Sequence, residues 1–218
     1  MKYKVWIVML VAIAVAFSAC KFGRGIAGSG NRKTEKRELK SFNSIDTSGA
    51  YEINVSCQKP ASFEIEADDN ILPLIKTEVR DGTLFVSNDQ EFHSSKSTIL
   101  RITLPEVNSV SSHGAGDIKI TDSNSSDLKI KSTGAANMEA TGKAKSVTIS
   151  STGAGNIDTS KLTAEKAKVD ATGAANVDVY ASDQLDVSVS GVGSVTYSGN
   201  PKTVNKSVSG IGSVNPKN

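Results

Sequence analysis

A short glycine motif recurs along the C-terminal half of the chain, and it constrains the fold more than any other feature. The copy at residues 151–158 reads Ser-Thr-Gly-Ala-Gly-Asn-Ile-Asp. From residue 114 onward its leading glycine returns at a nearly constant step, and a degenerate earlier copy adds a further glycine, which together give Gly49, Gly114, Gly134, Gly153, Gly173, Gly191 and Gly210. Self-similarity with a period of about 20 residues is typical of a solenoid, in which each repeat forms one coil.

Apolar and polar residues alternate on both sides of each leading glycine. Around Gly153 the apolar positions are Val147, Ile149 and Ile157. Alternation with a period of two indicates β-strands, and the glycine between them allows a tight corner, through a positive φ or a close backbone approach. One such coil cannot bury its apolar side alone. We therefore expect the coils to stack in register, about 4.8 Å apart, as an all-β parallel β-helix or β-solenoid.

Two polar columns follow from this register. Asparagine occupies the same place in three successive coils, and we expect Asn137, Asn156 and Asn176 to hydrogen-bond along the axis as a ladder. Two positions further on, an outward column of carboxylates would be spaced about 5 Å apart and consists of Glu139, Asp158 and Asp178.

Two hypotheses account for the carboxylate column. One is a calcium-assisted polysaccharide site. The preferred one is a solvated face, because the strands carry no aromatic platform for sugars. Nearby lysines would then relieve the repulsion between the carboxylates, and the candidates are Lys143, Lys161 and Lys166.

Residues 1–19 are expected to form an export signal. Lys2 and Lys4 precede an apolar run without charge, and small residues stand directly before Cys20. This layout resembles a bacterial lipobox, so we predict that Cys20 is lipidated and becomes the first mature residue; a plain secretory signal is the alternative. Residues 20–38 are rich in Gly, Lys and Arg without apolar periodicity, which predicts a flexible tether between lipid and domain.

The remainder, residues 39–218, is expected to be one solenoid domain. Segment 62–104 departs from the repeat period, so we predict an irregular cap or insertion over the N-terminal end of the stack. Regular repeats follow over 106–214. In the last coil Lys206 takes an inward position, which predicts a C-terminal cap that blocks pairing with another chain.

The composition argues against some partners, and the motifs in the sequence do not form a recognisable catalytic site. The chain has 25 basic and 23 acidic residues, and two of the basic ones lie in the export signal, so the balanced remainder argues against nucleic acid or an anionic membrane surface as an electrostatic partner. Neither His93 nor His113 has a cysteine or carboxylate at ligand spacing, and no G-x-S-x-G elbow is present. We predict no catalytic residue, no metal and no cofactor. Cys57 is expected to be a small buried hydrophobe.

With these features placed, the chain resembles the head GIN domain family, also labelled "putative auto-transporter adhesin", over about residues 39–216. The carriers are the repeats together with Phe42-x-x-Ile45, Ser48-Gly49-Ala50-Tyr51, Ala67-Asp68-Asp69-Asn70-Ile71-Leu72 and Gly82-Thr83-Leu84. The last two repeats depart from the motif, with Ser194 and Ser213 in place of asparagine. The resemblance implies a right-handed β-helix in an envelope lipoprotein of a Gram-negative bacterium, and it supplies no catalytic residues.

These observations predict a lipid-anchored, non-enzymatic binding module that contacts the membrane through its anchor and binds a glycan or an envelope protein. A polysaccharide-active lyase or hydrolase is the main alternative, and a purely structural spacer is the weaker one. Lys21 follows Cys20 where an aspartate is associated with inner-membrane retention, which favours the outer membrane.

Overall fold

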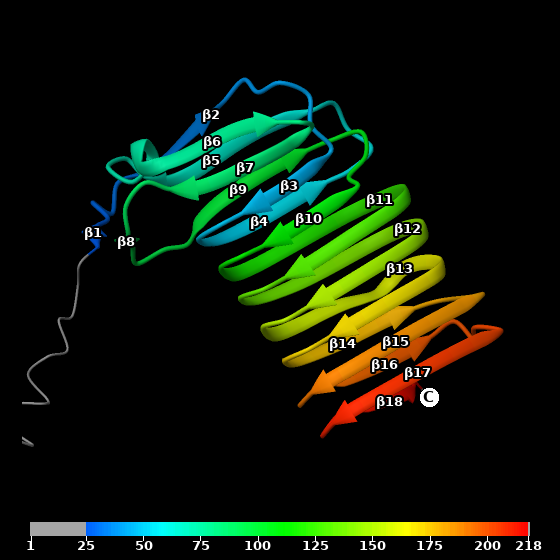
Figure 1. The fold of residues 1–218 in the computed structure, drawn as a ribbon. Helices are drawn as coiled ribbons and strands as arrows, with labels where there is room; N and C mark the ends of the chain where they lie inside the picture. The colour runs from blue at the N-terminus through cyan, green and yellow to red at the C-terminus, as the bar shows by residue number, and fades with distance from the viewer. Residues whose placement is uncertain (1–24, 218) are drawn as a thin grey trace, which may run out of the picture.

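A computed structural model describes residues 25–217 as a stack of β-coils, which confirms the predicted β-solenoid (Figure 1). The export signal and Cys20 lie outside the described residues. Strands of the N-terminal part are β1 (Ile26–Ala27), β2 (Arg32–Lys36), β3 (Ser44–Thr47), β4 (Ala50–Ser56), β5 (Ser62–Asp68), β6 (Ile75–Arg80), β7 (Thr83–Asn88), β8 (Phe92–His93) and β9 (Thr98–Thr103), with a 3-10 turn η2 (Leu72–Leu74) before β6.

The repeat region consists of longer strands and of strand pairs. They are β10 (Ser109–Ser112), β11 (Ala115–Ser132), β12 (Ala135–Ser151), β13 (Ala154–Ala171), β14 (Ala174–Tyr180), β15 (Gln184–Gly191), β16 (Ser194–Ser198), β17 (Thr203–Gly210) and β18 (Ser213–Pro216). Each of β11, β12 and β13 wraps around most of a coil, with a register irregularity where it bends, as between Ile120 and Ser123. No helix among residues 25–217 is long and apolar enough to cross a membrane.

The coils pair in parallel and in the register that the repeat predicts. On one side of the stack, which we call the ladder face, β4, the first parts of β11, β12 and β13, and then β14, β16 and β18 follow one another. On the other side, β7, β3, β10, the last parts of β11, β12 and β13, β15 and β17 do the same. Equivalent residues therefore form columns along the axis.

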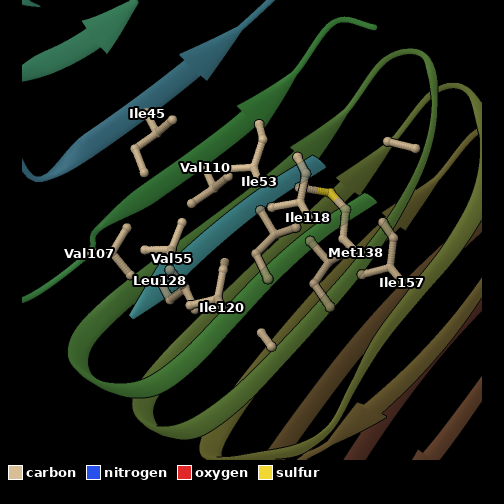
Figure 2. Close-up of a cluster of buried hydrophobic side chains, with 14 of the residues drawn as sticks. Ile45, Ile53, Val55, Val107, Val110, Ile118, Ile120, Leu128, Met138 and Ile157 are labelled. Atoms are coloured by element: carbon tan, nitrogen blue, oxygen red, sulfur yellow. The ribbon is translucent and has the colours of Figure 1, made fainter. Parts of the chain in front are cut away.

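Inward columns form one continuous apolar core. Figure 2 shows side chains from both sides of the stack pointing into the space between them, including Ile45, Val110, Ile118, Met138 and Ile157. Each of these five is at most 3 % exposed. Small aliphatic side chains fill the narrow interior, which explains how a chain with little aromatic content obtains a core.

The leading glycines form a column of their own at one corner. A Cβ atom on Gly134 would lie 1.8 Å from the carbonyl oxygen of Gly114, and Gly153 faces Gly134 in the same way. Of the two reasons given for glycine here, close backbone approach alone applies to Gly114, Gly134, Gly153 and Gly173, whereas Gly49, Gly191 and Gly210 have a positive φ. Two residues later, Gly155 has a φ of +146°.

Segment 62–104 lies at the N-terminal end of the stack, but it is more regular than expected. Its strands β7 and β9 form a coil that pairs in parallel with β3 and β4. Strands β5 and β6 then pair antiparallel to β9 and β7 and cover the outer edge of that coil. The chain therefore leaves the coil at residue 56, builds the end of the stack, and returns at residue 109. No periodic sequence pattern marks the change from parallel to antiparallel pairing, because the covering strands β5 and β6 are not copies of the repeat.

The prediction of a flexible tether over 20–38 is wrong for residues 26–36. Strand β2 pairs antiparallel with β5 over its whole length, from Arg32↔Asp68 to Lys36↔Glu64, and β1 pairs with β8. Charged side chains made this segment look like a linker. The backbone ladder with β5 holds it instead, and exposed ion pairs accompany that ladder, as in the contact of 3.1 Å between Lys36 Nζ and Glu64 Oε1.

Candidate functional site

The outward side of the ladder face brings the two predicted polar columns together. Paired strands place Asn137 beside Asp117, and Asn156 beside Asn176. The carboxylate column runs next to them, since Glu139 pairs with Asp158 and Asp158 with Asp178. Each column rises by one strand spacing per coil, about 4.8 Å. The face therefore presents a regular array of amides and carboxylates.

The amide column is a hydrogen-bonded ladder. Asn156 Nδ2 donates to Asn137 Oδ1 at 3.3 Å, and Asn176 Nδ2 donates to Asn156 Oδ1 at 3.2 Å. The ladder is longer than the three asparagines. Asn137 Nδ2 donates to Asp117 Oδ1 at 3.0 Å, and Ser194 Oγ donates to Asn176 Oδ1 at 2.8 Å. Sequence reasoning missed these two ends, although the motif position of Asp117 could have identified the first.

Positive charge is distributed along the carboxylate column. Lys119, which begins the column, places its Nζ 3.4 Å from Glu139 Oε2, and Lys161 Nζ lies 3.9 Å from Glu139 Oε1. Both lysines are well exposed, so each pair contributes little to stability. Their effect is to relieve repulsion between neighbouring carboxylates, as the solvated-face hypothesis expects. Of the three lysines that the sequence suggested for this purpose, Lys161 makes such a contact.

Asp158 is held in its ionised form. Burial acts to raise its pKa, but hydrogen bonds from Ser160 and the charges of Lys217 and Lys161 outweigh burial and leave the pKa below its ordinary value. The Ser160 backbone N–H donates to Oδ1 at 2.9 Å and the Ser160 hydroxyl donates at 2.6 Å. A carboxylate arranged in this way accepts hydrogen bonds. It is poorly suited to give up a proton as a general acid.

A hollow of about 440 Å³ lies over this face. Side chains of both columns line it, among them Asn54, Asp117, Asn137, Glu139 and Asp158. Carboxylates, asparagine amides and Lys119 share its lining, and Glu139 is paired with lysines rather than with another carboxylate. Within residues 25–217, no three His, Cys, Asp or Glu side chains converge in a way that could hold a metal ion. This arrangement can bind a polar ligand.

One further constellation was not visible in the sequence. His113 Nε2 lies 3.2 Å from Asp46 Oδ2, and His113 Nδ1 lies 2.8 Å from Thr133 Oγ1. The carboxylate comes from β3, far earlier in the chain, so no local spacing could show it. The order carboxylate–imidazole–hydroxyl is that of a catalytic triad. Here, however, Thr133 Oγ1 donates to the Ser112 carbonyl at 3.4 Å, which links consecutive corners. The three side chains tie neighbouring coils together at the surface.

Solved structures with the same fold support a family assignment. A "putative adhesin" from Bacteroides fragilis is 28 % identical, with a TM-score of 0.72 over 88 % of this chain and 100 % of that one. A "putative lipid binding protein" from Parabacteroides distasonis shares the fold at 20 % identity and a TM-score of 0.57, over 89 % of this chain and all of the other. A comparison with curated protein sequences finds no match.

The family model described as "Putative auto-transporter adhesin, head GIN domain" matches residues 41–201. These residues contain every coil from β3 to β16 and both outward columns of the ladder face. The segment Ala67–Leu72 and the glycine corners, which suggested the resemblance, all lie within the matched region or continue it by one repeat. The chain belongs to the head GIN domain family of adhesin-like proteins.

Proposed function

We propose that this chain is a lipid-anchored envelope protein that binds a partner through its ladder face without catalysing a reaction. The observation that carries the proposal is the unbroken ladder from Asp117 to Ser194, which runs beside a lysine-paired carboxylate column. Each ladder amide donates one hydrogen along the axis, and its second hydrogen remains for a ligand. The oxygens of Asn156 and Asn176 each accept one bond and keep a lone pair, whereas the oxygen of Asn137 accepts two bonds from Asn156. A glycan rich in hydroxyl groups fits this array, and an envelope protein is the other candidate.

The lowered pKa of Asp158 favours binding over catalysis at this carboxylate. Glycoside hydrolysis needs one carboxyl with a raised pKa as proton donor, and Asp158 has a lowered one. The family description and the name of the Bacteroides relative also refer to adhesion. These names support an exposed position in the envelope. The anchor at Cys20 and the outer membrane are proposed from the lipobox-like sequence.

Glycan-array binding tests the proposal. The protein would be used from residue 21 onward, since the structure shows that residues 26–36 belong to the fold. Asn137→Ala combined with Asn156→Ala should weaken binding at least about tenfold, because two adjacent hydrogen-bonding units are lost. Thr148→Ala combined with Ser150→Ala is the matched control on the opposite side of the stack and should leave binding unchanged.

Three other outcomes are informative. Capture of an envelope protein by the wild type, lost in the ladder variant, would replace the glycan with a protein partner. Turnover of a polysaccharide would contradict a non-enzymatic role. Equal binding by both double variants would show that the ladder face is not the binding surface.

A further inference from the structure

An N-terminal strap, defined here as residues 26–36, is part of the folded domain. The Ile26 N–H donates to the Glu91 carbonyl at 2.9 Å, and the Gly28 N–H donates to the His93 carbonyl at 2.8 Å. Further along the strap, β2 extends the ladder face beyond β5. Backbone hydrogen bonds at both ends of the strap therefore join it to the N-terminal end of the stack.

Two neighbouring side chains clamp the middle of the strap. Asn70 Nδ2 donates to the Ala27 carbonyl at 2.7 Å, and Asn70 Oδ1 accepts from the Ser29 N–H at 2.9 Å. Asp69 accepts from the Ser29 hydroxyl at 2.6 Å and from Asn31 Nδ2 at 2.8 Å. One amide thus binds the backbone on both sides of a glycine, and one carboxylate binds two polar side chains of the strap. These contacts give a role to the Asp69-Asn70 pair, which nothing in the repeat explains.

Close packing supports the clamp. A Cβ atom on Gly28 would lie 1.9 Å from Asp68 Oδ2, so the strap passes directly over that buried carboxylate. Arg32 then lies across the edge of the sheet with its side chain only 15 % exposed, and its Nη2 donates to the carbonyls of Glu66 and Ser97. A guanidinium buried in this way fixes the start of β2.

The clamp shortens the stretch of sequence between Cys20 and the first strand of the domain. From Cys20 to Ile26 there are six residue steps, which span at most about 20 Å when fully extended. If the chain were free as far as β3, 24 steps would span about 80 Å. The stack itself is nine strand spacings long from β2 to β18, or about 43 Å. The segment from Cys20 to Ile26, which we call the leash, is therefore shorter than the domain. It ends at β1, at the opposite end of the stack from β17 and β18 (Figure 1).

The surface beside β1 suits a bilayer headgroup region. The loop at residues 92–97 carries His93, Lys96 and three serines, with no acidic side chain. His93, Ser95, Lys96 and Ser97 are exposed. Serine hydroxyls and Lys96 can bind lipid phosphates, and the exposed Glu91 directly before the loop is the nearest acidic residue along the chain.

We infer that the end of the solenoid carrying β1, β8 and loop 92–97 is held against the membrane surface, with the C-terminal end directed away from it. The inference rests on the proposed lipidation of Cys20. The Asp69-Asn70 clamp sets the distance, because it converts most of a long linker into folded structure. The partner of this surface is the lipid headgroup layer of the membrane in which the anchor is inserted.

Energy transfer to a lipid-borne acceptor tests the orientation. The full chain, expressed with its export signal and purified in vesicles, would carry a donor dye on Ser95→Cys or on Asn215→Cys. Both positions are exposed and lie at opposite ends. Cys57 does not compete for the dye, because burial raises the pKa of its thiol to about 11. We expect severalfold stronger quenching at residue 95 than at residue 215. Equal quenching, or stronger quenching at 215, would overturn the inference.

A flotation control separates this inference from the proposed anchor. Wild type should float with vesicles and Cys20→Ala should not. If the wild type stays in solution, both the proposed anchor and the proposed orientation are contradicted. If it floats but quenching is equal at residues 95 and 215, only the orientation is contradicted.

Two variants test the leash. Asp69→Ala combined with Asn70→Ala should release the strap, lower the quenching at residue 95, and speed trypsin cleavage after Lys33 and Lys36 at least about tenfold. Asn205→Ala removes one exposed asparagine hydrogen bond from β17. As the control, it should leave both the quenching at residue 95 and the rate of trypsin cleavage unchanged. If the double variant fails to fold, an insertion of about ten Gly and Ser residues after Arg24 lengthens the leash without touching the clamp. Unchanged quenching with this insertion would also contradict the inference.

Discussion

The Nζ of Lys206 lies 4.7 Å from the centre of the Tyr197 ring and donates a hydrogen bond to the Val214 carbonyl at 3.1 Å. Lys206 pairs in register with the buried Val187, so it occupies an inward position in the last long strand. The ammonium thus covers the open end of the core and contacts an aromatic face and a backbone carbonyl there. A charge at this place disfavours the addition of another strand.

Lys206→Leu should increase self-association with little change in the free energy of unfolding. The cation–π contact contributes about 0.5–1 kcal/mol at an exposed site, which the added apolar contact offsets. Sedimentation velocity across a concentration series would show the association. Ser207→Leu adds the same side chain to an outward position of β17 and serves as the control. Similar association by both variants would mean that general hydrophobicity, rather than the open end, is responsible.

Gly134→Ala should destabilise the protein by about 3 kcal/mol or more, because its Cβ would meet the Gly114 carbonyl oxygen at 1.8 Å and the two backbones would have to separate. Gly30→Ala is the control. Gly30 has open space around it but a φ of +79°, so only backbone strain of about 1–2 kcal/mol is expected. Urea unfolding followed by circular dichroism measures both. A smaller loss at Gly134 than at Gly30 would contradict the role assigned to the glycine column.

Asn156→Ala should lower the free energy of unfolding by about 1–2 kcal/mol, because its amide donates to Asn137 and accepts from Asn176 in an exposed ladder. Hydrogen exchange should increase locally in β12, β13 and β14, since the ladder joins these strands. Asn215→Ala, at the end of the stack, loses only a contact with Ser213 and should have a smaller effect. An unchanged exchange pattern would show that the ladder adds nothing to the strand pairing.

Ser160→Ala should destabilise the protein near neutral pH but not in strong acid. The folded pKa of Asp158 is lower than its unfolded value, so the ionised form is favoured by folding. That stability is fully present above the unfolded pKa of about 3.9, and it is lost as pH falls through the folded pKa. The difference between wild type and Ser160→Ala should therefore shrink between about pH 5 and pH 2. Urea titrations at several pH values test this, with the Asp158 carboxyl followed by NMR.

Cys57 should resist alkylation in the folded protein near pH 8. Burial, followed by the negative charge of Asp122, raises its thiol pKa to about 11, so little thiolate forms. Iodoacetamide labelling should become fast only after unfolding, which mass spectrometry can follow. Rapid labelling under native conditions would show that the corner near Cys57 opens readily.

The sequence alone was sufficient for the repeated half of the molecule. A repeat with a fixed step places equivalent residues in register, so Gly134 had to stack on Gly114 and Asn156 had to lie between Asn137 and Asn176. Alternation identified the inward residues for the same reason, since side chains of a strand alternate between two environments.

The strand pairing at the N-terminal end of the stack could be seen only in the tertiary structure. Strand β2 is charged and has no periodic apolar side, so its pairing with β5 depends on partners that are distant in the sequence, such as Glu64 and Asp68. The coil formed by β7 and β9, and the contact between Asp46 and His113, also join segments that no local pattern relates. Periodicity can predict contacts between copies of one motif. Contacts between unlike segments follow from the assembled fold, and here they determine how short the leash to the membrane is.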